Sequence, residues 1–356
     1  MAVPAALAVR FAQVYREQAG IPEPHPPGFT PEAFGLPYEE MTVTTADGLD
    51  LPAWFVPARD GAPGPGVLLV HGWESARDRT LPNARVLHAA DFRHRSSGSV
   101  RGHGANRREV IAISAGEFGS DAAAGFDALL ARPEVTHGGI LGHSMGSIGA
   151  LLAAASDERV AAVVATATPA DPNLLTRQTF RLARLPIPDP IAWPLAWLTT
   201  RLYLRPRGHQ AARISATRAI ARYAGPVLLV HGSADRVVPF TDLDRLARAA
   251  RARRGRPVER LVIDEGQHSW LYESPEYRGV VARFFATHLG GPPDPDEAAG
   301  RARAVAASRL PDGELRFGAV AAEPGGLRSL AGVVTGGTAG DRSAGTLPGS
   351  SPATQG

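Results

Sequence analysis

The sequence lacks two residue types altogether, cysteine and lysine, over its 356 positions. Without cysteine the chain can form neither a disulfide nor a thiolate metal site. Cysteine usage therefore does not indicate whether the protein works in an oxidising or a reducing compartment. All 38 basic residues are arginine, which with the abundant Ala, Gly and Pro suggests GC-rich coding rather than a need for guanidinium groups. The net charge is only +3 and the arginines are interleaved with acidic residues, so nucleic-acid binding is not expected.

A membrane-spanning segment is also lacking. The N-terminal stretch MAVPAALAVRFAQVY is apolar, but it is short, is interrupted by Arg10 and lacks the basic start of a secretion signal. We therefore expect a cytoplasmic protein without stable membrane insertion. Weak peripheral membrane association through this segment, as an amphipathic helix, is the alternative.

Metal-binding patterns are absent as well. The histidines at 71, 94, 103 and 143 do not form an H-E-x-x-H or similar spacing. We therefore expect neither a metal nor another cofactor.

Strand-like and helix-like segments alternate over residues 38–291, which we assign to one domain. The turn at Asp47-Gly48 joins two strands at its start, and further apolar runs are separated by Ala- and Leu-rich helical segments. This alternation predicts an α/β fold with a layered sheet. The strand-like runs are 41–44, 51–56, 67–70, 139–141, 160–165, 227–230 and 261–263.

Three segments lie outside this alternation. Residues 1–37 comprise an N-terminal helix and a proline-rich lead-in. Residues 170–222 are too long for a simple crossover and are rich in Leu, Pro and Trp, which predicts an inserted helical cap. Residues 292–356 form a C-terminal extension, with one exposed helix at 295–310 and a low-complexity tail that is expected to be largely disordered.

The strongest chemical signal is the pentapeptide Gly142-His143-Ser144-Met145-Gly146, which has the form G-x-S-x-G. It follows a short apolar strand and precedes an Ala/Leu helix, and this context predicts a sharp strand-to-helix turn that exposes the serine hydroxyl. Small residues are then required at 142 and 146, where backbone approaches backbone. The pattern predicts that Ser144 is a nucleophile, against the alternative of a serine that merely begins a helix.

A serine nucleophile needs a base that is held by an acid. Asp235 follows the apolar run at 227–230, and His268 lies just past the last strand. We predict them as acid and base, because the order serine, aspartate, histidine is the one that this architecture uses. Asp264 and Glu265 are rival acids, and either predicted residue could instead be an ordinary turn or loop residue.

The reaction also needs N–H donors for the tetrahedral oxyanion. One should be the backbone N–H of Met145, the residue after the nucleophile. The other should be that of Trp73, because His71-Gly72 lets the chain turn closely beneath the site. Trp73 could equally be a packing residue, but its backbone N–H would remain available as a donor to the oxyanion.

These motifs together resemble the alpha/beta hydrolase superfamily, in particular its bacterial esterase-like and peptidase-like members. The H-G-x loop at 71–73, the G-H-S-x-G turn and the H-G-x-x-D turn ending at Asp235 occur in order, and the resemblance covers roughly residues 38–290. It implies an eight-stranded, mostly parallel sheet flanked by helices, with the cap after the sixth strand, and hydrolysis through an acyl-enzyme. The family's nucleophile, acid and base correspond to Ser144, Asp235 and His268, and its oxyanion amides to Trp73 and Met145.

The resemblance does not select a substrate. The apolar cap favours an uncharged, apolar carboxylic ester, and His71, His103, Trp193 and Trp197 are the candidate pocket residues, although the tryptophans could instead pack the cap onto the sheet. The alternatives are peptidase or aminopeptidase action, a thioesterase, and a hydrolase-like binding protein without catalysis. Two acidic residues in the cap that bind the free amine of a peptide would favour an aminopeptidase. Residues 175–222, however, contain a single acidic residue, Asp189. The oligomeric state is left open.

The stretch DFRHRSSGSVRGHGAN at 91–106 conflicts with the predicted fold. A buried strand should precede the turn at 101–104, but residues 93–99 offer nothing to bury, so the sequence predicts that this strand is absent. A short sequence error and a true local divergence into an irregular segment are the two interpretations. Either would weaken the sheet beside Ser144.

Overall fold

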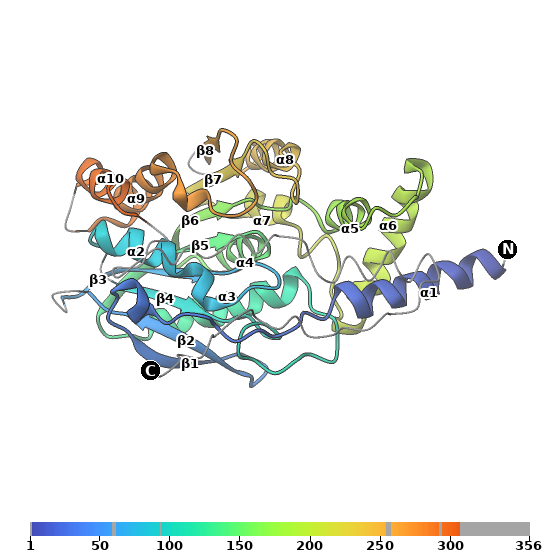
Figure 1. The fold of residues 1–356 in the computed structure, drawn as a ribbon, viewed down its shortest axis with the longest axis horizontal. Coiled ribbons are helices and arrows are strands. Elements are labelled where there is room, and N and C mark those ends of the chain that lie inside the picture. The colour runs from blue at the N-terminus through green and yellow to red at the C-terminus, as the bar shows by residue number, and fades with distance from the viewer. Residues whose placement is uncertain (1, 59–61, 93, 254–257, 292–293, 307–356) are drawn as a thin grey trace, which may run out of the picture.

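A computed structural model describes residues 2–58, 62–92, 94–253, 258–291 and 294–306 (Figure 1). The predicted disordered tail therefore lies outside the described residues from position 307 onward. The described part forms one twisted sheet with helices on both faces, and the predicted α/β fold is confirmed. No helix among the described residues has both the length and the apolar composition needed to cross a membrane.

The sheet has eight strands in the order β1-β2-β4-β3-β5-β6-β7-β8. The first two strands pair antiparallel, β2 also pairs antiparallel with β4, and all further neighbours are parallel. The strands span Glu39–Thr44, Asp50–Val56, Gly64–Val70, His94–Gly98, Val135–His143, Val160–Thr166, Val227–Gly232 and Val258–Ile263 for β1 to β8.

Strand β4 corrects the prediction that residues 93–99 break the sheet. Residues His94–Gly98 form a strand between β2 and β3, with Leu68 aligned to Ser96 on one side and Phe55 aligned to Ser96 on the other. The backbone of any residue type can join such a ladder, because the ladder uses N–H and C=O groups and not side chains. Two flanking strands that both need a partner therefore outweigh the unfavourable composition of the segment.

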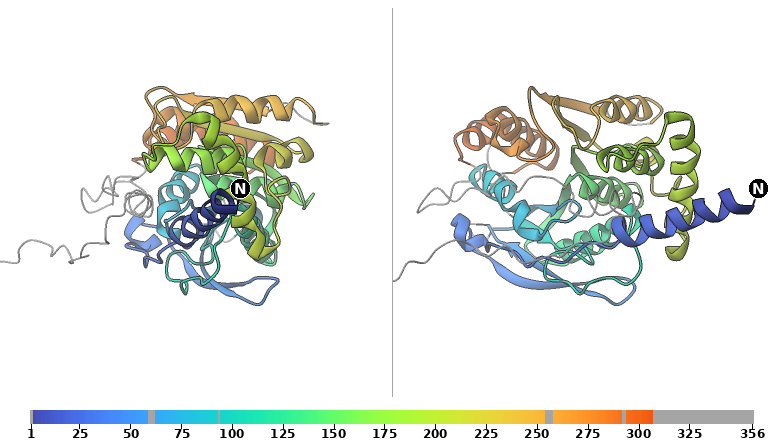
Figure 2. Two further views of the ribbon diagram at one scale, coloured as in Figure 1. Left: turned by 90° about the vertical axis from the view of Figure 1, so that its right-hand side faces the viewer. Right: turned by 45° about the vertical axis from the view of Figure 1, so that its right-hand side comes forward.

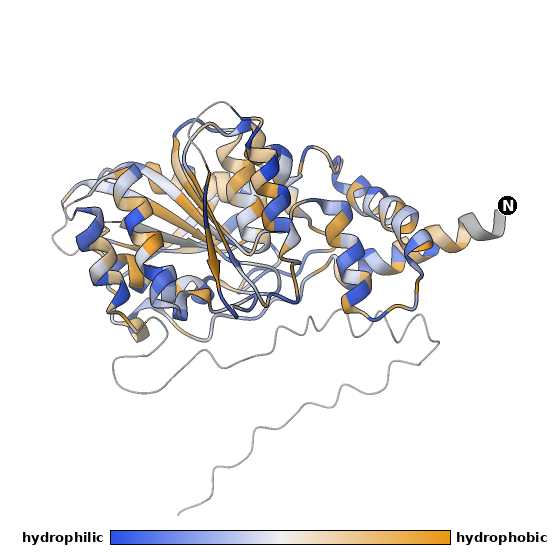
Figure 3. Cartoon of the chain, turned by 90° about the horizontal axis from the view of Figure 1, so that it is seen from above, coloured by the Kyte–Doolittle hydropathy of each residue, from blue (hydrophilic) through white to orange (hydrophobic). Residues whose placement is uncertain are grey.

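Alternating side chains on the central strands supply two cores, one on each face of the sheet. In β3, Leu68 and Val70 pack toward helices α3, α4, α7 and α8, whereas Val67 and Leu69 pack toward α2, α9 and α10. Figure 3 shows the hydrophobic colouring of these strands between the helical layers. A strand that is covered on both faces has to be apolar throughout, which is why these runs were recognisable in the sequence. These helices span Leu81–Ala89 (α2), Ala115–Leu130 (α3), Met145–Ala154 (α4), Ala216–Arg222 (α7), Thr241–Ala250 (α8), Pro275–Leu289 (α9) and Pro295–Arg303 (α10).

Two helices of the segment between β6 and β7 stand away from the layered domain. These are α5 (Pro172–Leu182) and α6 (Asp189–Leu204), whereas the following α7 packs on α4 and α8. Helix α1 (Ala2–Ala19) lies against α6, and both views of the molecule show the two helices crossing at the same end (Figures 1 and 2). Tyr15 of α1 packs edge-on against Phe180 of α5 and hydrogen-bonds Thr179 at 2.6 Å. The cap therefore consists of three helices, one of which comes from the N-terminal segment.

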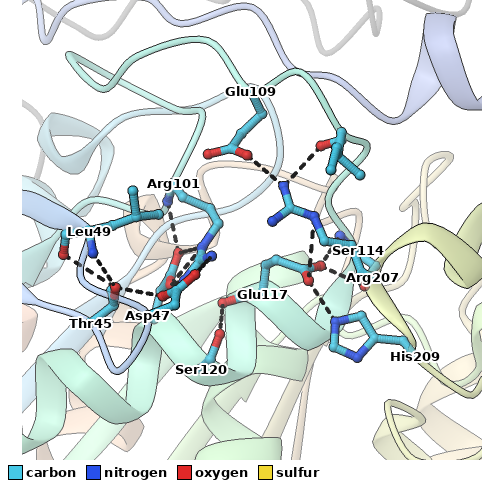
Figure 4. Close-up of polar contacts among 12 residues, drawn as sticks. Thr45, Asp47, Leu49, Arg101, Glu109, Ser114, Glu117, Ser120, Arg207 and His209 are labelled. Carbon is cyan, nitrogen blue, oxygen red and sulfur yellow. Dashed lines mark hydrogen bonds and ion pairs between the residues drawn. The ribbon is translucent and has the colours of Figure 1, made fainter.

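Polar contacts connect this cap to the main domain (Figure 4). His209 Nε2 lies 2.6 Å from the carboxylate of Glu117, and Arg207 donates to Glu109 at 2.5 Å. Glu117 also closes a capping box with Ser114 at the start of α3. The N-terminus of α3 is thus the point at which the segment after α6 is attached to the main domain.

Helix α10 is not the exposed helix that the sequence predicted. Ala298, Ala299 and Ala302 are fully buried, and the helix packs along α9 with a further contact to α2. Alanines spaced by three and four residues form a smooth stripe that allows close helix packing. The layered domain therefore continues past residue 291.

Candidate active site

Ser144 lies at a sharp turn between β5 and α4. Its backbone has φ 54° and ψ −118°, a strained conformation for a residue with a side chain. A Cβ at Gly146 would lie 2.3 Å from the backbone oxygen of His71, and one at Gly142 would lie 2.4 Å from the oxygen of Gly146. Only glycine fits at these two positions, as the sequence pattern required.

His268 lies between Ser144 and Asp235, in the loop after β8. Its Nε2 is 3.0 Å from Ser144 Oγ, and its Nδ1 is 2.8 Å from Asp235 Oδ2. Since an ionised carboxylate only accepts hydrogen bonds, Nδ1–H donates to Asp235 and leaves Nε2 free to accept the hydroxyl proton. The three side chains selected from the sequence are thus joined in one hydrogen-bonded chain, in which the imidazole can take a proton from the serine.

Asp235 is held in a tight turn after β7. Its Oδ1 accepts the backbone N–H groups of Val237 and Val238, at 2.8 and 2.9 Å. Burial alone raises the pKa of this carboxyl, but hydrogen bonds from His231, His268 and Val238 more than offset it and hold the pKa below its usual range. Asp235 therefore stays ionised at neutral pH although its side chain is fully buried.

His231 is a fourth member of this constellation that sequence reasoning missed. It lies at the end of β7, and its Nε2 is 3.1 Å from the carbonyl oxygen of Val238 and 3.4 Å from Asp235 Oδ2. Its N–H thus joins the two ends of the turn that carries the acid. The segment VLLVHG occurs twice in the sequence, at 67–72 and at 227–232, and His231 belongs to its second copy. Nothing in the spacing indicated that the His231 side chain would turn toward Asp235.

The rival acids lie elsewhere. Asp264 directs Oδ1 to the hydroxyl of Ser233 and to the backbone N–H of Glu265, both at 3.1 Å. Asp264 and Glu265 are both exposed. Asp235 is the carboxylate in contact with His268.

His143 lies beside His268 within the G-H-S-x-G turn. Its ring centroid is 5.0 Å from that of His268, and its Nδ1 is 3.1 Å from the hydroxyl of Thr166, which itself donates to Gly142. Burial and the neighbouring His268 lower the pKa of His143 to about 3, so it is neutral at physiological pH. It presents no charge that would oppose a proton on His268.

The loop after β3 passes directly beneath Ser144. A Cβ at Gly72 would lie 3.2 Å from Ser144 Cβ, so the backbone approaches the serine closely at this glycine. Trp73 and Met145 both line the cavity that contains Ser144. The two predicted donor residues therefore line the same cavity as Ser144.

His71 and His103 are buried beneath this loop and hold its shape. His71 donates from Nδ1 to the oxygen of Gly72 at 2.8 Å and accepts the Val100 N–H at Nε2, 3.1 Å away. Burial lowers the pKa of His71 to about 4 and that of His103 to about 3, so both are neutral. His103 packs edge-on against the ring of Trp73, with centroids 5.2 Å apart. His71 thereby ties the end of β3 to the segment after β4.

A cavity of about 1240 Å³ surrounds Ser144 and His268. His71 contributes to its wall as predicted, but three predicted pocket residues do not. His103 is fully buried behind Trp73, and Trp193 and Trp197 lie on the outer face of α6, about half exposed. The position of a helix in a cap does not reveal which of its faces points inward, and α6 turns Thr200, Tyr203 and Leu204 toward the cavity instead.

The N-terminal segment supplies a wall of this cavity that the sequence did not indicate. Residues between Tyr15 and Phe29 line it, including Gln18, Ile21 and Glu23. A Cβ at Gly20 would lie 2.5 Å from the ring of Tyr203, and the Gly20 oxygen accepts the N–H of Ile113. Across the described residues, no three His, Asp or Glu side chains are grouped so that they could hold a metal ion.

Replacing His231 tests whether it positions Asp235. We expect His231→Phe to lower kcat by about tenfold with little change in KM, because a hydrogen bond to a charged group contributes about 1.5 kcal/mol. His231→Gln keeps an N–H donor and should recover most of the rate. Equal losses in both variants, or a loss that appears in KM and not in kcat, would show that His231 only packs.

Comparison with known proteins agrees with this geometry. A model of the alpha/beta hydrolase family matches residues 67–283, more than half of the chain, while no curated protein sequence matches it. Among solved structures, an esterase of Pyrococcus furiosus is similar with 19% identity and a TM-score of 0.61, over 76% of this chain and 98% of that one.

Two peptidases are similar over part of their length. An acylaminoacyl peptidase of Pyrococcus horikoshii has 16% identity and a TM-score of 0.55, over 74% of this chain and 44% of that one. A puromycin-hydrolyzing peptidase of Mycobacterium tuberculosis has 19% identity and a TM-score of 0.56, over 73% of this chain and 40% of that one. At these identities the likeness is one of fold. The resemblance found in the sequence is confirmed, and the chain belongs to the alpha/beta hydrolase family.

Proposed function

We propose that the protein is a serine hydrolase that cleaves a carboxylic ester through an acyl-enzyme. The observation that carries the proposal is the unbroken hydrogen-bonded chain from Ser144 through His268 to Asp235, with both contacts at 3.0 Å or less. A buried, ionised carboxylate, a histidine of fixed tautomer and a serine at a strained turn are the three parts that nucleophilic acyl transfer needs.

In this mechanism His268 takes the hydroxyl proton as Ser144 attacks the carbonyl carbon of the substrate. The backbone N–H groups of Met145 and Trp73 donate hydrogen bonds to the carbonyl oxygen and stabilise the negative charge that develops on it. His268 then gives its proton to the leaving alcohol, and the acyl group remains on Ser144. A water molecule, activated by the same histidine, releases the acid and restores the serine.

The apolar side chains that line the cavity favour a substrate with an apolar acyl group. Leu175, Leu182, Leu204 and Ile214 line the cavity, which is of the size that holds a drug-sized ligand or a larger one. Apolar walls around the serine also exclude water and strengthen the oxyanion contacts.

Amide cleavage beside a free amine is the second candidate, and one observation favours it. Glu23 and Glu74 line the cavity, and burial raises the pKa of Glu74 while His25 and Glu23 act on it electrostatically. The acidic pair that the cap lacks could thus come from the N-terminal segment and the loop after β3. Such a pair would favour a substrate with a positively charged amine.

A substrate panel separates these candidates. We expect a fluorophosphonate probe to label the native protein and not its Ser144→Ala variant, and p-nitrophenyl esters to be cleaved faster as the acyl chain lengthens from two carbons. Aminoacyl anilides and acyl thioesters are assayed beside them. Preference for an aminoacyl anilide would favour the peptidase, and preference for a thioester would favour a thioesterase. A folded protein that is not labelled would refute the enzyme and leave a binding protein.

A further inference from the structure

The outer face of α6 carries an unusual concentration of exposed apolar side chains. Ile191, Trp193 and Trp197 are 58%, 46% and 51% exposed, whereas Ala192 and Ala196 on the opposite face are buried. Trp193, Pro194 and Trp197 line a shallow surface hollow together with Asp171, Asn173 and Leu174 at the start of α5. We call the five residues Leu174, Ile191, Trp193, Pro194 and Trp197 the α6 patch. Soluble proteins rarely expose two neighbouring tryptophans unless the surface binds something.

Arginines surround this patch and lie against its aromatic rings. The guanidinium of Arg177 lies 4.2 Å from the centre of the Trp193 ring, and that of Arg201 lies 3.5 Å from the Trp197 ring. Asp189 pairs with Arg177 at 2.6 Å and with Arg181 at 3.8 Å, so it balances only part of this positive charge. Tryptophan beside arginine is the pairing that suits the headgroup region of a bilayer, where one side meets apolar chains and the other meets phosphates.

The charge of the whole chain is concentrated in this region. Residues 170–215 contain seven arginines and two aspartates, a net charge of +5, although the full chain carries only +3. The remainder of the protein therefore carries a net charge of only −2. A basic cap on a nearly neutral body would orient the molecule cap-first toward an anionic surface.

The geometry of the cap fits such an orientation. Helix α6 turns its outer face to solvent and lines the substrate cavity with Thr200, Tyr203 and Leu204. Helix α1 crosses α6 at the same end of the molecule and adds Leu7 and Val9, which are 66% and 41% exposed (Figures 1 and 2). Helix α6 thus faces the proposed membrane surface on one side and the cavity on the other.

We propose that the α6 patch and the arginines around it bind the surface of an anionic lipid bilayer. The tryptophans insert at the level of the headgroups, and Arg181 and Arg201 contact lipid phosphates. The binding does not depend on the reaction proposed for Ser144, so either could hold without the other.

Vesicle flotation with the full chain tests this surface. We expect the protein to float with vesicles of equimolar phosphatidylcholine and phosphatidylglycerol, to bind phosphatidylcholine alone weakly, and to be released at high ionic strength. Trp193→Ala/Trp197→Ala should weaken binding on the order of tenfold, from the apolar area that no longer inserts. Arg181→Gln/Arg201→Gln should weaken it by roughly 25-fold, about fivefold for each charge removed. The arginine pair is exposed, so this variant also serves if the tryptophan variant does not fold.

Leu49→Ala/Val262→Ala is the matched control, since both residues are exposed and apolar but lie in the β1–β2 turn and in β8, outside the cap. This variant should float like the native protein. Flotation that persists in both patch variants, equal binding to the two kinds of vesicle, or the absence of flotation would overturn the proposal. Concentration-dependent dimers that only the tryptophan variant loses, without vesicle binding, would assign the patch to a second copy of the chain instead.

Discussion

Replacing Ser144 by alanine is expected to lower kcat for ester hydrolysis by about 10⁶-fold, because no other group in the hydrogen-bonded chain can form the acyl-enzyme. His268→Ala should cost about as much, and the double variant should lose little more, since the two residues act as one unit. Asp235→Asn should cost about 10⁴-fold, because the amide favours the wrong tautomer of His268. KM should change only a few-fold in each variant. Initial rates with a p-nitrophenyl ester measure all of these effects.

Ser75→Ala is the matched control, because Ser75 lines the same cavity without belonging to the hydrogen-bonded chain. It should retain nearly native activity. If Ser144→Ala kept more than about one hundredth of the native kcat, a loss far below that expected for a nucleophile, the acyl-enzyme would have to form elsewhere. Equal losses for Ser75→Ala and Ser144→Ala would point to a disturbed cavity and not to a lost nucleophile.

Replacing Arg101 by methionine is expected to lower the free energy of unfolding by about 3–5 kcal/mol, the usual cost of leaving one buried charge without its partner. Arg101 follows β4, and its guanidinium contacts Asp121 of α3 at 2.6 Å and Asp47 at 2.6 Å. The side chains of Arg101 and Asp121 are almost fully buried. Arg101 thus connects the turn at 101–104 to α3 and to the β1–β2 turn, and Figure 4 shows it beside Asp47. Urea denaturation of the variant and the native protein measures the loss.

The pH dependence of this loss has a definite sign. Burial raises the pKa of Asp121 above its usual range, whereas the hydrogen bond with Arg101 lowers that of Asp47. Asp47 therefore stabilises the native fold above the usual aspartate pKa of about 4, and this contribution is lost on acidification. In the variant an ionised Asp121 destabilises the fold until it is protonated. The difference between variant and native protein should be largest at neutral pH and should shrink toward pH about 4.

Arg159→Met is the control for this experiment. Arg159 also contacts two aspartates, Asp157 and Asp127, but its side chain is more than half exposed. Water screens an exposed ion pair, so the unfolding free energy should stay near the native value. A similar loss in both variants would mean that burial is not what makes Arg101 important.

The sequence by itself determined the sheet strands that are apolar throughout, the family and the three residues of the proposed triad. These features depend on short local patterns. A strand covered on both faces must be apolar, a sharp turn must have glycine at Gly142 and Gly146, and the acid and base must follow particular strands. Such requirements restrict residues that are close together in the sequence, so they can be recognised without knowing the rest of the fold.

Only the tertiary structure decided the features that depend on residues far apart in the chain. Strand β4 forms because β2 and β3 lie on either side of it, although its own composition argued against a strand. His231 contacts Asp235 because β7 ends beside the acid turn, and Tyr15 lines the cavity because α1 packs on the cap. Trp193 and Trp197 face outward because α6 turns its opposite face inward, where Ala192, Ala196 and Leu204 are buried. Backbone pairing, the rotation of a helix about its axis and long-range packing decide these features. None of the three can be recognised from the spacing of neighbouring residues.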